Sequence, residues 1–89
     1  MVQRTVDLVN RLGLHARAAA KFVHVSARFR SDVLVRHNDD EVNGKSILGL
    51  LLLAAPYGSH LTVTATGDDE GEAIAAIETL IRERFGEDE

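Results

Sequence analysis

The chain has 89 residues, which suffice for one hydrophobic core and are too few for two. Its content of 45% hydrophobic and 27% charged residues is that of an ordinary globular domain and excludes a disordered or fibrous chain. The formal net charge of −4 argues against nucleic-acid binding, which needs a clustered basic surface. The absence of cysteine excludes disulfides and thiolate metal sites and suits a reducing compartment.

The longest apolar run, at 47–55, is far shorter than the roughly 20 residues of a membrane span, and the N-terminus lacks the apolar run of a signal peptide. We therefore expect a single cytoplasmic domain, 1–89, that does not insert into membranes. In chain order, apolar periodicity and turn residues predict a strand at 2–9, a helix at 16–29, strands at 33–35 and around 41–42, a helix at 47–55, a strand at 61–66 and a helix at 69–86.

This β-α-β-β-α-β-α order predicts an α+β open-faced sandwich, in which a four-stranded antiparallel sheet is covered on one face by three helices. Asp69 and Glu72 have the spacing of a capping pair at the start of the last helix. The tail at 87–89 is expected to fray.

The segment before the first helix places His15 at or beside its N-cap, where free backbone N–H groups point outward. The positive end of the helix and the Arg17 cation both disfavour imidazolium, so His15 is expected to be a neutral nucleophile near pH 7. The backbone N–H groups of Ala16 and Arg17, and the Arg17 side chain, could then bind the oxygens of a phosphoryl group. A polar helix start with a solvated arginine remains the alternative.

The sequence Leu-Gly-Leu-His-Ala-Arg-Ala-Ala at 12–19 closely resembles the active-site segment of HPr, the histidine-containing phosphocarrier family of the phosphoenolpyruvate-dependent phosphotransferase system. The sequence Gly-Lys-Ser-Ile-Leu-Gly at 44–49 matches that family as well, and length and element order extend the resemblance over the whole chain. Where the family usually has proline after the arginine, this chain has Ala18, which implies a looser first turn with one more free N–H donor.

The resemblance implies that His15 accepts a phosphoryl group on Nδ1 from phosphorylated enzyme I and passes it to an EIIA-type acceptor. Arg17 would stabilise the phosphate, and the partner would complete the site. No cofactor is implied, and the chain would act as a relay with a phosphohistidine intermediate rather than as a stand-alone enzyme.

Ser46 is predicted to be the N-cap of the second helix. Gly44-Lys45-Ser46 resembles the end of a nucleotide-binding P-loop, but Asp39 stands where that motif needs its first glycine. The family resemblance implies that Ser46 is a regulatory site, phosphorylated by an HPr kinase/phosphorylase. Phosphorylation would add a charge of about −1.5 to −2 and disfavour an acidic partner.

The second helix is apolar almost all round, so some of its side chains must be exposed. We expect Leu50 and Leu53 in the core, and Leu48 and Leu51 outside it. An exposed apolar patch usually marks a contact site. The resemblance implies that a partner docks on Arg17, Ala20, Ile47, Leu48 and Leu51.

His24, among Arg17, Arg28 and Arg30, is assigned to a basic rim around the site that attracts acidic partners, with a solvated surface as the alternative. His24, His37 and His60 lack metal-ligand spacing, so no metal is expected.

Two other functions remain open. In the first, the chain is a regulatory binding module in which phosphorylated Ser46 recruits a transcription factor and His15 is idle. The second, a small nucleic-acid binder, is disfavoured by the acidic balance and the lack of surface aromatics. Within the carrier interpretation, the sequence does not separate sugar uptake from a nitrogen-related regulatory branch, and a monomer is expected.

Overall fold

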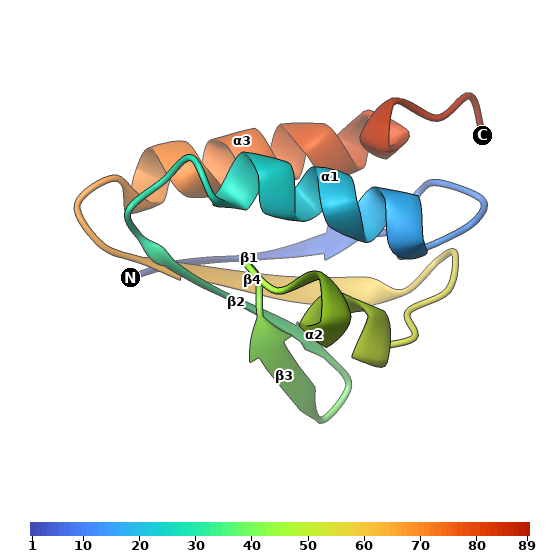
Figure 1. Cartoon of the computed structure of the whole chain (residues 1–89), viewed down its shortest axis with the longest axis horizontal. Coiled ribbons are helices and arrows are strands. Elements are labelled where there is room, and N and C mark those ends of the chain that lie inside the picture. Colours follow the sequence, from blue (N-terminus) through green and yellow to red (C-terminus); the bar gives the residue numbers. More distant parts are fainter.

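Four strands form one antiparallel sheet in the computed structural model, which describes all 89 residues (Figure 1). The strands are β1 (Val2–Asp7), β2 (Asp32–His37), β3 (Asp40–Asn43) and β4 (His60–Thr66), in the order β1-β4-β2-β3. In the register of the central pair, Val63 of β4 lies opposite Val35 of β2. The two edges of the sheet are therefore β1 and β3.

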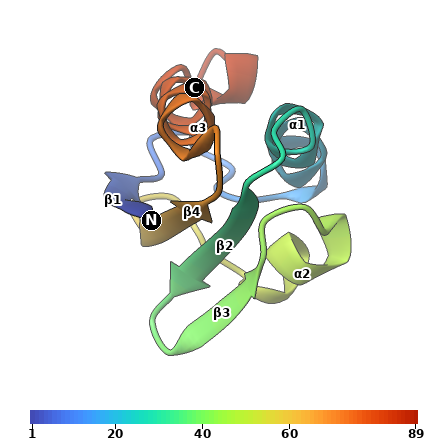
Figure 2. The same ribbon diagram turned by 90° about the vertical axis from the view of Figure 1, so that its left-hand side faces the viewer.

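Three α-helices cover one face of this sheet, and the predicted fold class is confirmed. They are α1 (Ala16–Ser26), α2 (Ile47–Leu52) and α3 (Glu70–Arg82), followed by the short 3-10 helix η1 (Arg84–Gly86). Seen along the helices, α3 lies over β1 and β4, α1 over β2, and α2 lies beside β2 and β3 (Figure 2). None of the helices has both the length and the apolar character that crossing a bilayer requires.

The core lies between the sheet and the helices, and the alternation along β4 shows how the sequence builds it. Leu61, Val63 and Ala65 are buried, whereas Thr62 and Thr64 are only half-buried because they point to the other face. The helical layer supplies the largest buried side chains, which include Phe22, Leu50, Ile77 and Phe85. Aliphatic packing with two buried phenylalanines thus fixes the position of α1 over the sheet.

All three helices end earlier than their apolar pattern predicts. The first helix ends at Ser26 and not at 29, since the Ser26 hydroxyl donates to the carbonyl of Gly44 (2.8 Å) and ties the helix end to the segment after β3. The second helix ends at Leu52 and not at 55, since Ala54 adopts a positive φ of 49°. The last helix ends at Arg82, because Arg84 and Phe85 adopt positive φ angles of 59° and 56° and turn the chain. The tail that follows lies at the same end of the molecule as the start of α1 (Figure 1).

The predicted capping pair at the start of α3 is wrong. Asp69 makes no side-chain cap to its own helix; its carboxylate instead accepts hydrogen bonds from the backbone N–H of Arg30 (2.9 Å), the backbone N–H of Ser31 (3.0 Å) and the Ser31 hydroxyl (2.5 Å). These bonds, led by the one from the Ser31 hydroxyl, lower the pKa of Asp69 to about 2. Asp69 therefore joins the start of α3 to the connection between α1 and β2.

We expect Asp69→Asn to lower stability at neutral pH and to lower it less at acid pH. The pKa of Asp69 is about 2 in the folded chain and 3.8 ordinarily, so its contribution is present above the ordinary value and is lost as the pH falls toward 2. Urea unfolding at about pH 7 and about pH 3 measures this, with Asp68→Asn as the control because Asp68 is exposed. An equal difference from the parent at both pH values would contradict the assignment.

Candidate functional site

The loop between β1 and α1 is held in one conformation by contacts to the segment after α2. Gly13 has a φ of 67°, and a Cβ placed there would lie 2.6 Å from the carbonyl oxygen of Ala55. The next residue, Leu14, is buried, and its N–H donates to that same oxygen (2.9 Å). The close backbone contact explains why residue 13 is a glycine, and it fixes the position of the residue that follows Leu14.

That residue is His15, and the structure places it at the N-cap of α1, as predicted. Its backbone is extended, its carbonyl accepts from the N–H of Ala19 (2.8 Å), and its ring makes no cap. The N–H groups of Ala16, Arg17 and Ala18 in the first turn have no acceptor within the helix. Ala16 and Arg17 are exposed whereas Ala18 is buried, so the open donors lie beside a half-buried imidazole and a free guanidinium.

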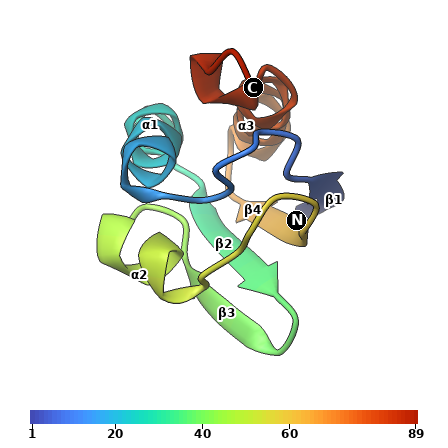
Figure 3. The same ribbon diagram turned by 90° about the vertical axis from the view of Figure 1, so that its right-hand side faces the viewer.

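The C-terminal tail also contributes to this site, and this contribution was not predicted from the sequence. The C-terminus and the start of α1 lie at the same end of the molecule (Figure 3), and Oε2 of Glu87 lies 2.5 Å from Nε2 of His15. Backbone carbonyls help to hold the tail: the ammonium of Lys21 donates to the carbonyl of Phe85 (2.6 Å), and the N–H of Arg11 donates to the carbonyl of Glu89 (2.9 Å). The expectation of a frayed tail is therefore wrong, because the tail is bound at both ends.

Glu87 changes the electrostatics expected around His15. Burial on its own raises the pKa of Glu87, but hydrogen bonds from Asn10 and His15 and the charges of His15 and Lys21 together bring that pKa below its ordinary value. Glu87 is therefore a carboxylate at neutral pH. The prediction that the surroundings disfavour imidazolium counted only the helix end and Arg17, whereas Glu87 adds an opposing negative charge beside the ring.

Ser46 is the N-cap of α2, as predicted. Its side-chain oxygen accepts from the N–H of Gly49 (3.0 Å), and a Cβ at Gly49 would lie 3.3 Å from that oxygen. Ser46 is half-buried, and the two residues that follow it, Ile47 and Leu48, are exposed. The hydroxyl therefore lies at the border of an apolar surface.

The exposed apolar side chains of α2 are not quite the expected ones. Leu50 and Leu53 are buried and Leu48 is 69% exposed, as expected. Leu51, however, is half-buried and packs against the core, while Leu52 is 71% exposed. The reason is that α2 packs against both α1 and β3. Contacts with two elements cover more of the helix surface than packing against the sheet alone would.

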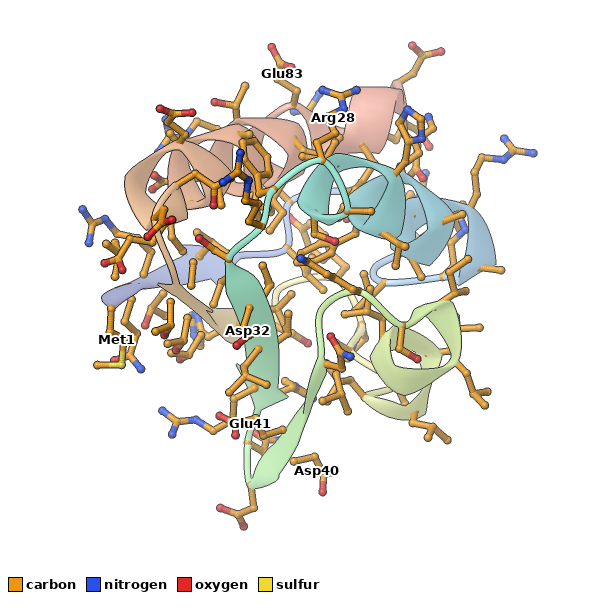
Figure 4. All side chains as sticks on the ribbon, turned by 60° about the vertical axis from the view of Figure 1, so that its left-hand side comes forward. Met1, Arg28, Asp32, Asp40, Glu41 and Glu83 are labelled. Carbon is orange, nitrogen blue, oxygen red and sulfur yellow. The ribbon has the colours of Figure 1, made fainter.

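Of the residues assigned to a basic rim, only Arg17 lies next to His15. His24 is exposed in the last turn of α1, nine residues and about 13 Å along the helix from His15. Arg28 and Arg30 follow the helix, and Arg28 lines a shallow groove with Thr79 of α3, on the outer side of the helical layer (Figure 4). Ala20 is exposed on α1 nearer to His15. No three His, Cys, Asp or Glu side chains form a group that could hold a metal ion.

Comparisons with known proteins give matches over most or all of the chain. Residues 2–83 match the family described as "PTS HPr component phosphorylation site". The chain is 46% identical to the phosphocarrier protein HPr of Neisseria meningitidis serogroup A over 89 residues, which is 100% of both chains. Its structure is similar to the crystal structure of HPr-C-His from Thermoanaerobacter tengcongensis, with a TM-score of 0.96 and 42% identity over 100% of both chains.

A further similar structure has been described as a dimer. The Crh protein of Bacillus subtilis, described as a dimer with a swapped domain, is 42% identical with a TM-score of 0.76, over 94% of this chain and 97% of that one. The matches with the Neisseria and Thermoanaerobacter proteins extend through the tail, which the match at 2–83 does not include.

Proposed function

Because this chain belongs to the HPr family, the HPr component of the phosphotransferase system, we propose that His15 accepts a phosphoryl group from phosphorylated enzyme I and passes it to an EIIA-type acceptor. The observation that carries the proposal is the position of the imidazole at the N-cap of α1, beside open N–H groups and the exposed Arg17. The chain acts in the cytoplasm, as a monomer, and depends on its partners for turnover.

The geometry supports transfer through Nδ1 of His15. The lone pair of Nδ1 forms the bond to phosphorus as the bond to the donor breaks, and the negative charge of the group is carried on its oxygens. The N–H groups of the exposed residues Ala16 and Arg17, together with the Arg17 guanidinium, are the donors available to those oxygens. Helix end and guanidinium are in place before the reaction, so no reorganisation is needed to stabilise this charge.

Intact-mass measurement after incubation with phosphoenolpyruvate and enzyme I from the same source tests the proposal. The parent protein should gain one acid-labile phosphoryl group, His15→Ala should gain none, and Arg17→Ala should react about 100-fold more slowly. An unmodified parent, or a labelled His15→Ala protein, would overturn the carrier role. If the His15→Ala protein still carries out regulation through Ser46, the binding-module interpretation takes its place.

Partner docking is proposed for the exposed apolar surface beside the site. Ile47 and Leu48 of α2 and Ala20 of α1 are exposed, and exposed apolar patches usually mark contact sites. Leu51 supports this surface from a half-buried position, and His24 lies at the far end of α1 as an outer contact. A partner covering this surface would also reach Arg17 in the first turn of α1.

We expect Ser46→Asp to slow phosphorylation of His15 by enzyme I about tenfold or more, since an added negative charge beside Ile47 and Leu48 opposes an acidic partner. A kinase of the HPr kinase/phosphorylase type would produce the same effect through a larger charge. Ser46→Asn is the matched control, because asparagine also caps a helix but carries no charge. Initial rates of phosphorylation measure the effect, and equal rates for the two variants would contradict it.

A further inference from the structure

The ring of His15 has one hydrogen-bond partner in this chain, and that partner selects between its two nitrogens. Nε2 lies 2.5 Å from Oε2 of Glu87, while Nδ1 has no partner. A carboxylate only accepts hydrogen bonds, so Nε2 must carry the hydrogen of this contact. In a neutral ring, Nδ1 then has the free lone pair.

We propose that Glu87 is a positioning residue for the phosphoryl transfer: it holds His15 in the Nε2–H tautomer and keeps Nδ1 open toward the incoming group. The inference rests on the proposed function only in the step that uses Nδ1. The tautomer itself follows from the contact between Glu87 and His15, and it can be measured without any partner protein.

The position of Glu87 is built into the core through Asn10. Asn10 is fully buried, and its amide nitrogen donates both to the carbonyl of Gly13 (2.7 Å) and to Oε1 of Glu87 (3.0 Å). Its Oδ1 is buried and has no partner. A buried acceptor without a donor is unfavourable, yet the reversed amide would set Oδ1 against two acceptors. Asn10 is therefore used for its two donors, which join the loop before His15 to the tail.

The same arrangement balances the charges of the transfer step. When the lone pair of Nδ1 bonds to phosphorus and the bond to the donor breaks, the proton stays on Nε2 and the ring becomes positively charged. The carboxylate of Glu87 lies beside that charge, while the first turn of α1 and Arg17 face the phosphoryl oxygens. When an acceptor takes the phosphoryl group, the bond between Nδ1 and phosphorus breaks and its electron pair returns to Nδ1. His15 is then a neutral imidazole again, with its proton still on Nε2.

Glu87→Gln tests the inference, because a glutamine amide cannot replace both carboxylate oxygens. If its oxygen accepts from Asn10, its NH₂ group faces Nε2, which must then accept, and the hydrogen moves to Nδ1. Nitrogen-15 spectra of the neutral ring should therefore show the Nε2–H tautomer in the parent and a shift toward Nδ1–H in the variant. The rate of phosphorylation by enzyme I should fall by at least about tenfold.

Asp88→Asn is the matched control, since it removes an exposed tail carboxylate that has no contact with the ring. It should leave both the tautomer and the rate unchanged. A folded Glu87→Gln protein with the parent tautomer would overturn the inference, and so would a shifted tautomer with an unchanged rate. Failure of the parent to accept phosphate would overturn the proposed function, while the ring spectra would still decide whether Glu87 holds the tautomer.

Discussion

Gly13→Ala is expected to lower the free energy of unfolding by about 3 kcal/mol or more. The φ of 67° alone costs an alanine roughly 1 kcal/mol. The added Cβ would also lie 2.6 Å from the carbonyl oxygen of Ala55 and 2.9 Å from the carbonyl carbon of Pro56. These are backbone atoms, and the oxygen is held by the N–H of Leu14 (2.9 Å), so relief requires moving the loop that carries His15.

Gly58→Ala separates the two causes. Gly58 also has a positive φ, of 86°, but nothing lies within 4 Å of an added Cβ. This control should lose about 1 kcal/mol, from backbone strain only, and should accept phosphate at the parent rate. Urea unfolding gives the stabilities, and the difference between the two variants is the cost of the backbone contact. Equal losses would mean that the segment after α2 gives way and does not fix the loop.

The features predicted from the sequence are those that neighbouring residues decide. The alternation of Leu61, Val63 and Ala65 with threonines determines which face of β4 is buried, because side chains alternate along a strand wherever it pairs. The caps at His15 and Ser46 are local in the same way, since a helix start leaves N–H groups for the residues just before it.

The features that were missed depend on partners distant in the sequence. Asp69 has the spacing of a cap, but its carboxylate bonds to Arg30 and Ser31, 39 and 38 positions away. The contact between His15 and Glu87 joins residues 72 positions apart, and no local pattern contains it. One local signal near the tail was present, namely Phe85, which lies within the helix predicted at 69–86 and which, as a large apolar side chain, is expected to be buried.

Phe85→Ala is expected to lower the free energy of unfolding by about 3–5 kcal/mol, the usual cost of a buried phenylalanine, and also to release the tail from the site. Phe85 is 1% exposed, its carbonyl accepts from the ammonium of Lys21, and Glu87 follows two residues later. Without the Phe85 side chain, the carboxylate of Glu87 should no longer be held against the ring of His15. Unfolding by urea and the nitrogen-15 signals of the ring measure the two effects.

Phe22→Ala is the matched control, because Phe22 is equally buried but lies within α1 rather than in the tail. It should cost a similar amount of stability while the ring signals of His15 keep their parent tautomer. Where the alanine proteins do not fold, Phe85→Leu, which removes less volume, should show a smaller loss in the same direction. If both alanine variants change the ring equally, Glu87 is held by the general stability of the domain; if only Phe85→Ala does, the buried aromatic of the tail is what brings the carboxylate to His15.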